Sequence, residues 1–246
     1  MRALLLPMLA FALLVACSDS SDSPAPAPEP ALPFLSYHGT TQPRGGDCSE
    51  PVDTGSPLIF NGFGGNPANT RNVGSIIDSD NVHELTLNYR YAPDNANEKR
   101  GAPAVTAQAI FLTSGDTLVA LNRLSGCEYW SYTTGHGGGA FRSGSILFVQ
   151  AAGELPAMIY AGDFNGYVYA LDAGTGEAYW RVRVGTEVFF HFVTGGLAYH
   201  AGKLFVPVSS KEVLATLAVP GPCCRSHGML VALDARTGET LWQYHT

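Results

Sequence analysis

Short apolar runs separated by glycine, aspartate and asparagine dominate the chain from Leu58 onward. No segment keeps the 3.6-residue period of an amphipathic helix, so the pattern predicts an all-β chain in which helix is scarce. The expected strands include 109–113, 117–121, 145–150, 158–161, 167–171, 203–208 and 229–233. One short helical turn is expected within 76–85, beginning at Asp78 or Asp80.

One eleven-residue phrase occurs three times and ends each time in tryptophan. It reads ALNRLSGCEYW at 120–130, ALDAGTGEAYW at 170–180 and ALDARTGETLW at 232–242. The chain has no tryptophan outside these phrases. Self-similarity at about 40–50 residues is typical of a β-propeller blade, a sheet that buries its faces only against neighbouring sheets.

The chemistry of the phrase fits a tight turn between two strands. In the second copy, the Asp172 carboxylate can accept backbone N–H groups within the turn, and Gly176 supplies a positive φ that a side chain would resist. The next strand ends in Trp180, which is large enough to wedge between adjacent sheets. We therefore expect an all-β partial propeller of about three four-stranded blades. Trp130, Trp180 and Trp242 should be buried in equivalent places between blades.

The phrase resembles the tryptophan-docking motif of the quinoprotein dehydrogenases, propellers that carry pyrroloquinoline quinone (PQQ). The chain looks most like the polyvinyl-alcohol dehydrogenase branch. The stretches that carry this resemblance are Asn-Thr-Arg at 69–71, SGCEYWSY at 125–132, KLFVPVSS at 203–210 and Pro-Cys-Cys at 222–224. The resemblance covers roughly residues 58–246 and implies the quinoprotein propeller fold over that range.

The resemblance also implies how much of a propeller is present. Residues 58–91 look like the family's N-terminal lead-in, which normally pairs with the last blade to close the ring. Closed propellers have typically 4–8 blades, and the family resembled here uses the larger number. Three blades make an open array, so we expect residues 58–246 to be an N-terminal fragment of the family's propeller or a truncated gene product.

The N-terminus has the proportions of a secretory signal. Arg2 precedes an almost wholly apolar run, which is shorter than the ~20 residues that a spanning helix needs. The ending Leu-Val-Ala-Cys looks like a bacterial lipobox, which predicts a signal peptide over 1–16 and lipidation of Cys17. An ordinary cleaved signal peptide with an incidental cysteine is the alternative. Ser18 favours the outer over the inner membrane, so we expect a lipid-anchored protein of the cell envelope, facing the periplasm or the cell surface.

Composition separates the N-terminal region from the propeller and narrows the partners. Residues 17–33 are rich in serine, proline and alanine and should form a disordered tether, followed by an irregular lead-in over 34–57. The chain has a net charge of −7 and no basic cluster, which makes nucleic acid an unlikely partner. In an oxidising compartment Cys48 and Cys127 could form a disulfide, although the sequence does not settle the pairing.

A stretch of the third unit resembles the cofactor-lining segment of quinoprotein alcohol dehydrogenases. The resemblance implies that Thr194 and Ser209 or Ser210 hydrogen-bond PQQ and that Glu212 is a Ca²⁺ ligand. Calcium prefers hard oxygen ligands, and beside the quinone oxygens it would polarise the carbonyl that accepts hydride. The alternatives are strand-end hydrogen bonding for the serines and a solvated loop carboxylate for Glu212.

Two further candidates for PQQ binding come from the same resemblance. Arg142 lies where the family has an arginine that reaches PQQ, and a guanidinium can bind a carboxylate in two-pronged fashion. Cys223 and Cys224 could form a vicinal disulfide over the cofactor plane. Their position is one unit later than in the alcohol dehydrogenases, and Arg225 is displaced from the polyvinyl-alcohol pattern. A structural loop or a pair of ordinary thiols is therefore the alternative.

The resemblance implies oxidation of a secondary alcohol or polymer, with electrons passed to an acceptor such as a cytochrome. The family's catalytic aspartate, its stacking tryptophan and its remaining calcium ligand have no matching position, so no catalytic residue is assigned. No Cys-x-x-Cys-His motif for covalent haem occurs. We expect the isolated chain to bind PQQ weakly or not at all and to be inactive alone. The alternative function is a non-catalytic propeller lipoprotein that acts as an envelope scaffold or binding module.

Overall fold

The computed structural model describes residues 46–66, 68–71, 77–86, 88–89, 91, 101–135, 141, 146–185, 191–212 and 226–246. The chain divides into two units, Met1–Gly39 and Thr40–Thr246. All described residues belong to the second unit. Among them, no helix is both long and apolar enough to cross a lipid bilayer.

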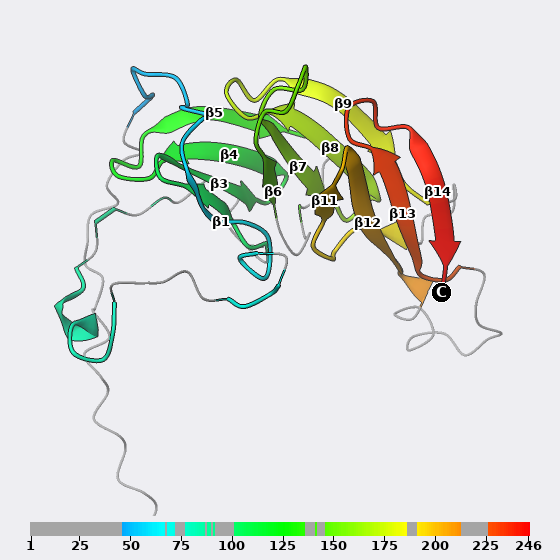
Figure 1. The fold of residues 1–246 in the computed structure, drawn as a ribbon, viewed down its shortest axis with the longest axis horizontal. Coiled ribbons are helices and arrows are strands. Elements are labelled where there is room, and N and C mark those ends of the chain that lie inside the picture. Colours follow the sequence, from blue (N-terminus) through cyan, green and yellow to red (C-terminus); the bar gives the residue numbers. More distant parts are fainter. Residues whose placement is uncertain are drawn as a thin grey trace, which may run out of the picture. The chain divides into compact units, whose positions relative to one another are not determined.

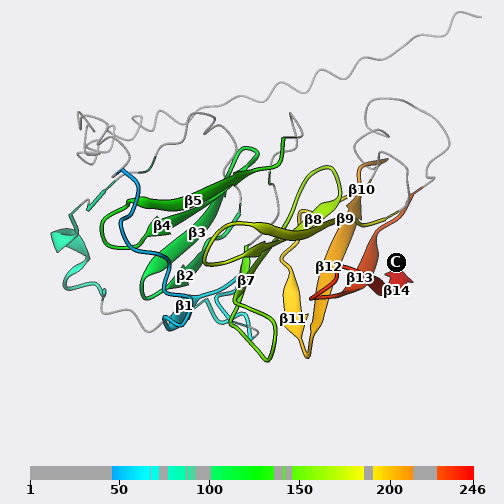
Figure 2. The same cartoon turned by 90° about the horizontal axis from the view of Figure 1, so that it is seen from above.

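The described strands form three antiparallel sheets (Figures 1 and 2). The first sheet has the order β1 (Leu58–Phe60), β2 (Ala104–Thr106), β3 (Ala109–Ser114), β4 (Thr117–Asn122) and β5 (Glu128–Thr133). The second sheet is β6 (Leu147–Val149), β7 (Met158–Gly162), β8 (Tyr167–Asp172) and β9 (Ala178–Arg183). Successive strands are neighbours in both sheets, which is the meander of a propeller blade.

The third sheet differs only in its innermost strand. It has the order β10 (His191–Phe192), β12 (Lys203–Ser210), β13 (Met229–Asp234) and β14 (Thr240–His245), and β11 (Ala198–His200) also pairs with β12. The innermost strand is therefore in two pieces, β10 and β11, which pair with opposite ends of β12. The prediction of an all-β partial propeller with about three four-stranded blades is confirmed. The fifth strand of the first sheet, β1, comes from the lead-in.

The three copies of the phrase occupy the same register in their sheets. Ala120 pairs with Trp130 between β4 and β5, and Ala170 pairs with Trp180 between β8 and β9. Ala232 pairs with Trp242 in the same way between β13 and β14. Each pair is followed by a register shift at the next leucine, so the three hairpins share even their bulge.

The turn chemistry predicted from the phrase is confirmed. Asp172 Oδ1 accepts the backbone N–H groups of Gly174 and Thr175 at 2.8 and 2.9 Å. Equivalent pairs of bonds run to Asp234 in the third sheet and to Asn122 in the first. The phrase glycines all have positive φ, between 73 and 75°. Only glycine adopts this conformation without cost, so the turn specifies this residue.

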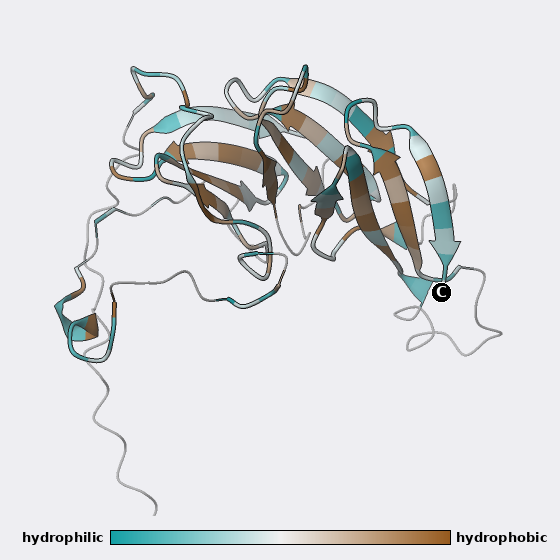
Figure 3. Cartoon of the chain, viewed as in Figure 1, coloured by the Kyte–Doolittle hydropathy of each residue, from teal (hydrophilic) through white to brown (hydrophobic). Residues whose placement is uncertain are grey.

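Two hydrophobic cores join the sheets. One contains residues of the first and second sheets, including Phe111, Trp130 and Tyr169. The other contains residues of the second and third sheets, with Trp180 packed against it. Figure 3 shows the corresponding hydrophobic colouring along β4, β7 and β13, whereas β14 carries a mixture of hydrophobic and hydrophilic residues.

The prediction of three equivalently buried tryptophans is wrong for Trp242. Trp130 is 9% exposed and Trp180 is partly buried, but Trp242 is 42% exposed. The sheet position of Trp242 is equivalent, so the difference has another cause. A phrase from a following sheet covers each of the first two tryptophans, and no such phrase lies over β14 among the described residues.

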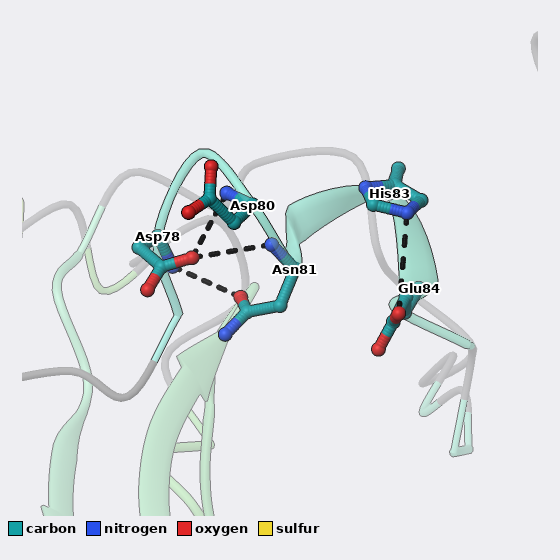
Figure 4. A network of polar contacts seen from close by, with 5 residues as sticks. All are labelled: Asp78, Asp80, Asn81, His83 and Glu84. Atoms are coloured by element: carbon teal, nitrogen blue, oxygen red, sulfur yellow. Dashed lines mark hydrogen bonds and ion pairs between the residues drawn. The ribbon is translucent and has the colours of Figure 1, made fainter.

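The helical turn within 76–85 is present, although it begins later than predicted. A 3₁₀ helix, η1, spans Val82–Glu84. It does not begin at Asp78 or Asp80, because Asp78 Oδ1 instead accepts the backbone N–H groups of Asp80 and Asn81 in the preceding turn (Figure 4). Asp78 therefore organises the turn before the helix and not the helix itself.

Candidate cofactor site at the ends of strands β10 and β12

The short strand β10 brings the predicted cofactor residues of the third sheet together. His191 pairs with Ser210, and Phe192 pairs with Ser209, at the C-terminal end of β12. Thr194 follows two residues after Phe192. A Cβ at the adjacent Gly195 would lie 2.5 Å from Cγ of Pro207, so the absence of a side chain there lets this segment approach β12 closely.

Ser210, Ser226 and Glu212 form a closed hydrogen-bonded ring just beyond the end of β12. Glu212 Oε2 accepts hydrogen bonds from the Ser226 hydroxyl, at 2.9 Å, and from the Ser226 backbone N–H. The backbone N–H of Glu212 donates to Ser210 Oγ at 3.2 Å. The two hydroxyls are 2.6 Å apart. Because the Ser226 proton is directed at Glu212, Ser210 donates to Ser226.

This ring positions the Ser210 hydroxyl and the Glu212 carboxylate. Ser226 is 7% exposed, and Ser210 and Glu212 are partly buried. Glu212 is therefore not a freely solvated loop carboxylate, while Ser210 does make hydrogen bonds of the strand-end kind. Ser226 was not singled out in the sequence, because nothing in its local pattern shows that it lies against Glu212.

A lysine and two phenylalanines lie beside this ring and were also missed in the sequence. Lys211 Nζ is 4.4 Å from the ring centroid of Phe164 and 5.6 Å from that of Phe192. The two aromatic rings have centroids 4.7 Å apart. A cation over an aromatic face is electrostatically attracted to it. Phe164 lies in the turn between β7 and β8 of the second sheet. The cluster therefore links parts of two sheets and leaves no signal in a single stretch of sequence.

A buried aspartate fixes the turn that presents Phe164. Asp163 is fully buried and accepts hydrogen bonds at 2.8 Å from the backbone of Asn165, the backbone of Tyr167 and the hydroxyl of Tyr169. Burial, and then the charge of Asp163 with this hydrogen bond, raise the pKa of Tyr169 well above its ordinary value. The backbone N–H of Val193 donates to the Asp163 carbonyl, which ties the end of β10 to the same turn.

Two histidines meet at the same end of the third sheet. His227 Nε2 lies 2.6 Å from His245 Nδ1, and the His191 ring lies 3.1 Å from the His227 carbonyl. His227 is exposed and precedes β13. Among the described residues, no group of three or more histidine, cysteine, aspartate or glutamate side chains could hold a metal ion.

Several predicted residues lie outside the described ranges. These are Arg142, Cys223, Cys224 and the lipidation candidate Cys17. The remaining cysteine pair is described, and Cys48 and Cys127 form a disulfide with a Cα–Cα distance of 5.2 Å. The pairing that the sequence left open is therefore present, and it joins the segment 34–57 to the first copy of the phrase.

The described donor set suits an anionic cofactor better than a calcium ion. The Lys211 ammonium follows Ser210 directly in the chain and lies over two aromatic rings, and a fixed cation of this kind recognises carboxylates. Calcium takes 6–8 oxygen ligands, whereas Glu212 supplies the single carboxylate of the ring and its Oε2 is already engaged by Ser226. The described residues fit part of a PQQ site and do not by themselves fit a calcium site.

A cavity of about 270 Å³ lies at a different place, between the second and third sheets. Leu155, Tyr199, Asp234 and Arg236 are among its lining residues. None of the predicted cofactor residues lines it. The candidate site therefore rests on the hydrogen-bonded ring and its neighbours and not on this cavity.

The three docked sheets define a propeller of the quinoprotein type, and the comparisons with known proteins agree. Among solved structures, the quinohemoprotein alcohol dehydrogenase ADHIIG from Pseudomonas putida matches with a TM-score of 0.62 at 21% identity, over 78% of this chain and 27% of that chain. A europium-containing methanol dehydrogenase matches with a TM-score of 0.59 at 20% identity, over 76% of this chain and 32% of that chain. These likenesses show the fold.

The sequence relatives define the branch more narrowly. The polyvinylalcohol dehydrogenase of a Pseudomonas species is 33% identical over 202 residues, which is 80% of this chain and 30% of the relative. That of a Sphingopyxis species is 31% identical over 207 residues, 83% of this chain and 31% of the relative. A family model described as outer membrane protein assembly factor BamB matches residues 164–246.

The resemblance to the PQQ-dependent dehydrogenases is thus confirmed, and polyvinylalcohol dehydrogenases are among the relatives of this chain. The chain spans about 30% of the length of the curated relatives that it matches.

Proposed function

We propose that this chain forms one wall of the cofactor site of a PQQ-dependent alcohol dehydrogenase. The observation that carries the proposal is the ordered ring of Ser210, Ser226 and Glu212 at the end of β12, in a chain 33% identical to a polyvinylalcohol dehydrogenase. A hydride-accepting quinone supplies the oxidising chemistry of such enzymes. The proposed substrate class is a secondary alcohol, including polymeric alcohols, and the proposed electron acceptor is a cytochrome.

In this proposal, the described residues bind and orient the cofactor. Thr194 and Ser209 donate hydrogen bonds to its carboxylate and quinone oxygens, and Ser210 does so by turning its one proton from Ser226 to the cofactor. Lys211 adds a cation on an aromatic support. Ser226 holds Glu212 in place beside the serines. Arg142, Cys223 and Cys224, which lie outside the described residues, are proposed to complete this wall by binding a carboxylate and covering the cofactor plane.

We propose Glu212 as a calcium ligand only together with further ligands. Its Oε2 would have to exchange the Ser226 bonds for the ion, and the other ligands would come from outside the described residues. We derive no chemical step through calcium from the residues described. The isolated chain should bind PQQ weakly and oxidise no alcohol, because a one-sided site leaves the charges of the cofactor screened by water.

A titration of the purified chain with PQQ, monitored by backbone NMR, tests whether these residues bind the cofactor. Addition of PQQ should shift the amide signals of Thr194, Ser209, Ser210 and Ser226 and leave that of Glu239, in the β13–β14 turn, unchanged. Ser210→Ala should reduce the shifts, while the control Glu239→Gln should not. Equal shifts throughout the chain, or none at the four named amides, would contradict the proposal. Dye-linked alcohol oxidation by the isolated chain would show that one wall suffices.

The N-terminal region is proposed to tether this wall to the envelope. Residues 1–16 would be a signal peptide, Cys17 the lipidated residue, 17–33 a tether and 34–57 a lead-in to the propeller, with the outer membrane favoured. Metabolic labelling with palmitate should mark the wild-type chain and not Cys17→Ser. Label that persists in the variant would refute lipidation at this residue.

A non-catalytic scaffold is the second candidate function. The observation that favours it is the match of residues 164–246 to a family model described as an outer membrane protein assembly factor. A scaffold needs the docked sheets but not the Ser210–Ser226–Glu212 ring. The PQQ titration separates the two candidates, because a scaffold would show no localised shifts around Ser210.

A further inference from the structure

Two exposed histidines face each other where β13 begins and β14 ends. His227 precedes β13 by two positions, and His245 is the final residue of β14. The Nε2 atom of His227 lies 2.6 Å from the Nδ1 atom of His245. The two rings have centroids 4.7 Å apart and an interplanar angle of 64°. One nitrogen of each ring is therefore directed at the other ring.

The distance between these nitrogens restricts where the protons of the two rings can be. One facing nitrogen carries a proton and the other is a bare acceptor, because two lone pairs or two N–H groups would repel each other at this distance. A neutral imidazole can also hold its proton on its other nitrogen. Both side chains are exposed, so solvent can carry out that exchange. The pair can thus present two lone pairs to a cation that takes the place of the shared proton.

Hydrogen bonds hold the backbone on both sides of the pair. His245 belongs to the β13–β14 ladder. The backbone N–H and the hydroxyl of Thr246 both donate to the Gly228 carbonyl at 3.0 Å. The His227 carbonyl lies 3.1 Å from Nε2 of the buried His191. Because these contacts place both backbones in advance, a ligand that bridges the two rings has to immobilise only two side chains.

The separation of the facing nitrogens is near that of two ligands on one metal ion. Zinc–imidazole bonds are about 2.0–2.1 Å long, so two of them at a right angle or a tetrahedral angle place the nitrogens about 2.9–3.4 Å apart. The nitrogens of His227 and His245 therefore have to separate by roughly 0.3–0.8 Å to accept an ion of this kind. Rotation of two exposed side chains supplies such a movement without a change in the sheet.

We propose that His227 and His245 bind a divalent transition-metal ion such as Zn²⁺ between Nε2 of the first ring and Nδ1 of the second. Imidazole suits zinc, copper and nickel, whereas calcium and magnesium prefer oxygen ligands. The net charge of −7 favours a cation at an exposed site. Two protein ligands leave the other positions of a four-coordinate ion to water, so the site is open and the ion exchangeable.

The histidine pair differs in chemistry from the Ser210–Ser226–Glu212 ring, although Ser226 is the residue before His227. That ring offers hydroxyls and one carboxylate, whereas the pair offers only imidazole nitrogen. Within the described ranges, no third histidine, cysteine, aspartate or glutamate completes a larger metal-binding group. The proposed metal site therefore does not depend on the proposed cofactor.

A zinc titration of the purified chain, monitored by the ¹H–¹⁵N signals of the histidine rings, tests this site. A metal buffer sets the free Zn²⁺ concentration, so that zinc bound elsewhere on the chain does not distort the curve. The ring signals of His227 and His245 should shift together and saturate with one micromolar Kd. The signal of His200, an exposed histidine of the same sheet, should not follow this curve. Ca²⁺ and Mg²⁺ should leave all three signals unchanged.

Single substitutions show whether both rings hold one ion. The second ring binds an ion that the first already holds, so His227→Gln and His245→Gln should each weaken zinc binding at the remaining ring by roughly a hundredfold. His200→Gln is the matched control and should leave the Kd unchanged. Two results would overturn the proposal. One is an absence of shifts at His227 and His245 at millimolar free Zn²⁺, and the other is a His227→Gln variant whose His245 ring binds zinc as tightly as in the wild type. Either would mean that the pair is a hydrogen bond between two rings and no metal site.

Discussion

Trp130 and Trp242 hold the same place in equivalent sheets and have opposite surroundings. Each pairs with the alanine that opens its phrase and lies about equally far from an aromatic ring of its own sheet. Trp130 is 9% exposed and donates to a carbonyl of the second sheet, whereas Trp242 is 42% exposed. A sheet of this fold therefore positions its tryptophan by itself, but only the next phrase buries it.

This difference shows where the stability of the fold resides. In repeat architectures, much of the stability comes from the interfaces between neighbouring units. Here each interface between two described sheets contains, beside its hydrophobic core, one indole ring, one glycine with positive φ and one alanine carbonyl. The lead-in gives the first phrase a substitute cover through Tyr89, and the disulfide of Cys48 with Cys127 fastens that end. The end covered by Tyr89 and the exposed strand β14 should consequently respond very differently to substitution.

The largest contrast is expected between the two tryptophans themselves. Trp130→Ala removes a buried ring and its hydrogen bond and should lower the free energy of unfolding by about 3–5 kcal/mol. Trp242→Ala removes a half-exposed ring and should cost about 1 kcal/mol or less. Chemical denaturation of both variants measures the difference. Equal losses would mean that docking on the second sheet adds nothing to the burial of Trp130.

Removal of the disulfide tests how much the link between Cys48 and Cys127 stabilises the first sheet. Replacing Cys48 and Cys127 together by alanine should lower the free energy of unfolding by about 2–4 kcal/mol, because the bridge closes a long loop of the unfolded chain. The cysteines are 79 positions apart. Denaturation under non-reducing conditions checks this value. A variant as stable as the wild type would show that Tyr89 and its neighbours cover the first phrase without the bridge.

A comparison of Gly176 with Gly202 isolates the contact between a glycine and the Trp130 ring. Gly176 and Gly202 both have φ near +75°, but Trp130 lies against Gly176 while nothing lies within 4 Å of a Cβ at Gly202. Gly176→Ala should cost about 1–3 kcal/mol more than Gly202→Ala, since the shared backbone strain cancels and the overpacking remains. The comparison of unfolding curves gives this difference. Similar curves would indicate that Trp130 moves aside freely.

Alkaline pH should destabilise the junction of the first and second sheets through Tyr169. Its pKa is raised in the folded state by burial and by Asp163. Above pH ~10 an unfolded tyrosine loses its proton while folded Tyr169 keeps it, so the stability conferred by Tyr169 is present below pH 10 and falls as the pH rises.

Stability curves between pH 8 and 11 test this dependence. Tyr169→Phe should flatten the alkaline decline, whereas the control Tyr179→Phe, at a half-exposed ring, should leave it unchanged. Tyr169→Phe should also cost about 1–3 kcal/mol at neutral pH, because the buried Asp163 carboxylate loses a hydrogen bond. An unaltered alkaline slope in Tyr169→Phe would contradict the assignment.

The phrase and the hydrophobic pattern predicted most of the fold, because both are local. The strands, the Asp172 turn and the positive φ of Gly176 depend on neighbouring residues and could be seen in the sequence. The exposure of Trp242 could not, since burial depends on what a following sheet supplies. Tyr89 was also missed, because a lead-in tyrosine over Gly126 has no counterpart in the repeated phrase.

The candidate site was predictable to a smaller extent for the same reason. Thr194, Ser209, Ser210 and Glu212 follow each other along the third unit, and the resemblance to quinoprotein dehydrogenases singled them out. Their partners lie far away in sequence. Ser226 reaches Glu212 across a long connection, and Phe164 reaches Lys211 from the second sheet. Such contacts are set by the packing of sheets and not by the pattern of one strand.

The most direct test of the docking account is hydrogen exchange at the three indole N–H groups of the wild-type chain, followed by NMR. Trp130 and Trp180 donate to carbonyls of the next sheet, so their protons should exchange slowly. The exposed Trp242 proton should exchange at nearly the rate of a free indole. Two protected protons and one that exchanges fast is the predicted result. Three protons with similar rates, whether all slow or all fast, would contradict the account.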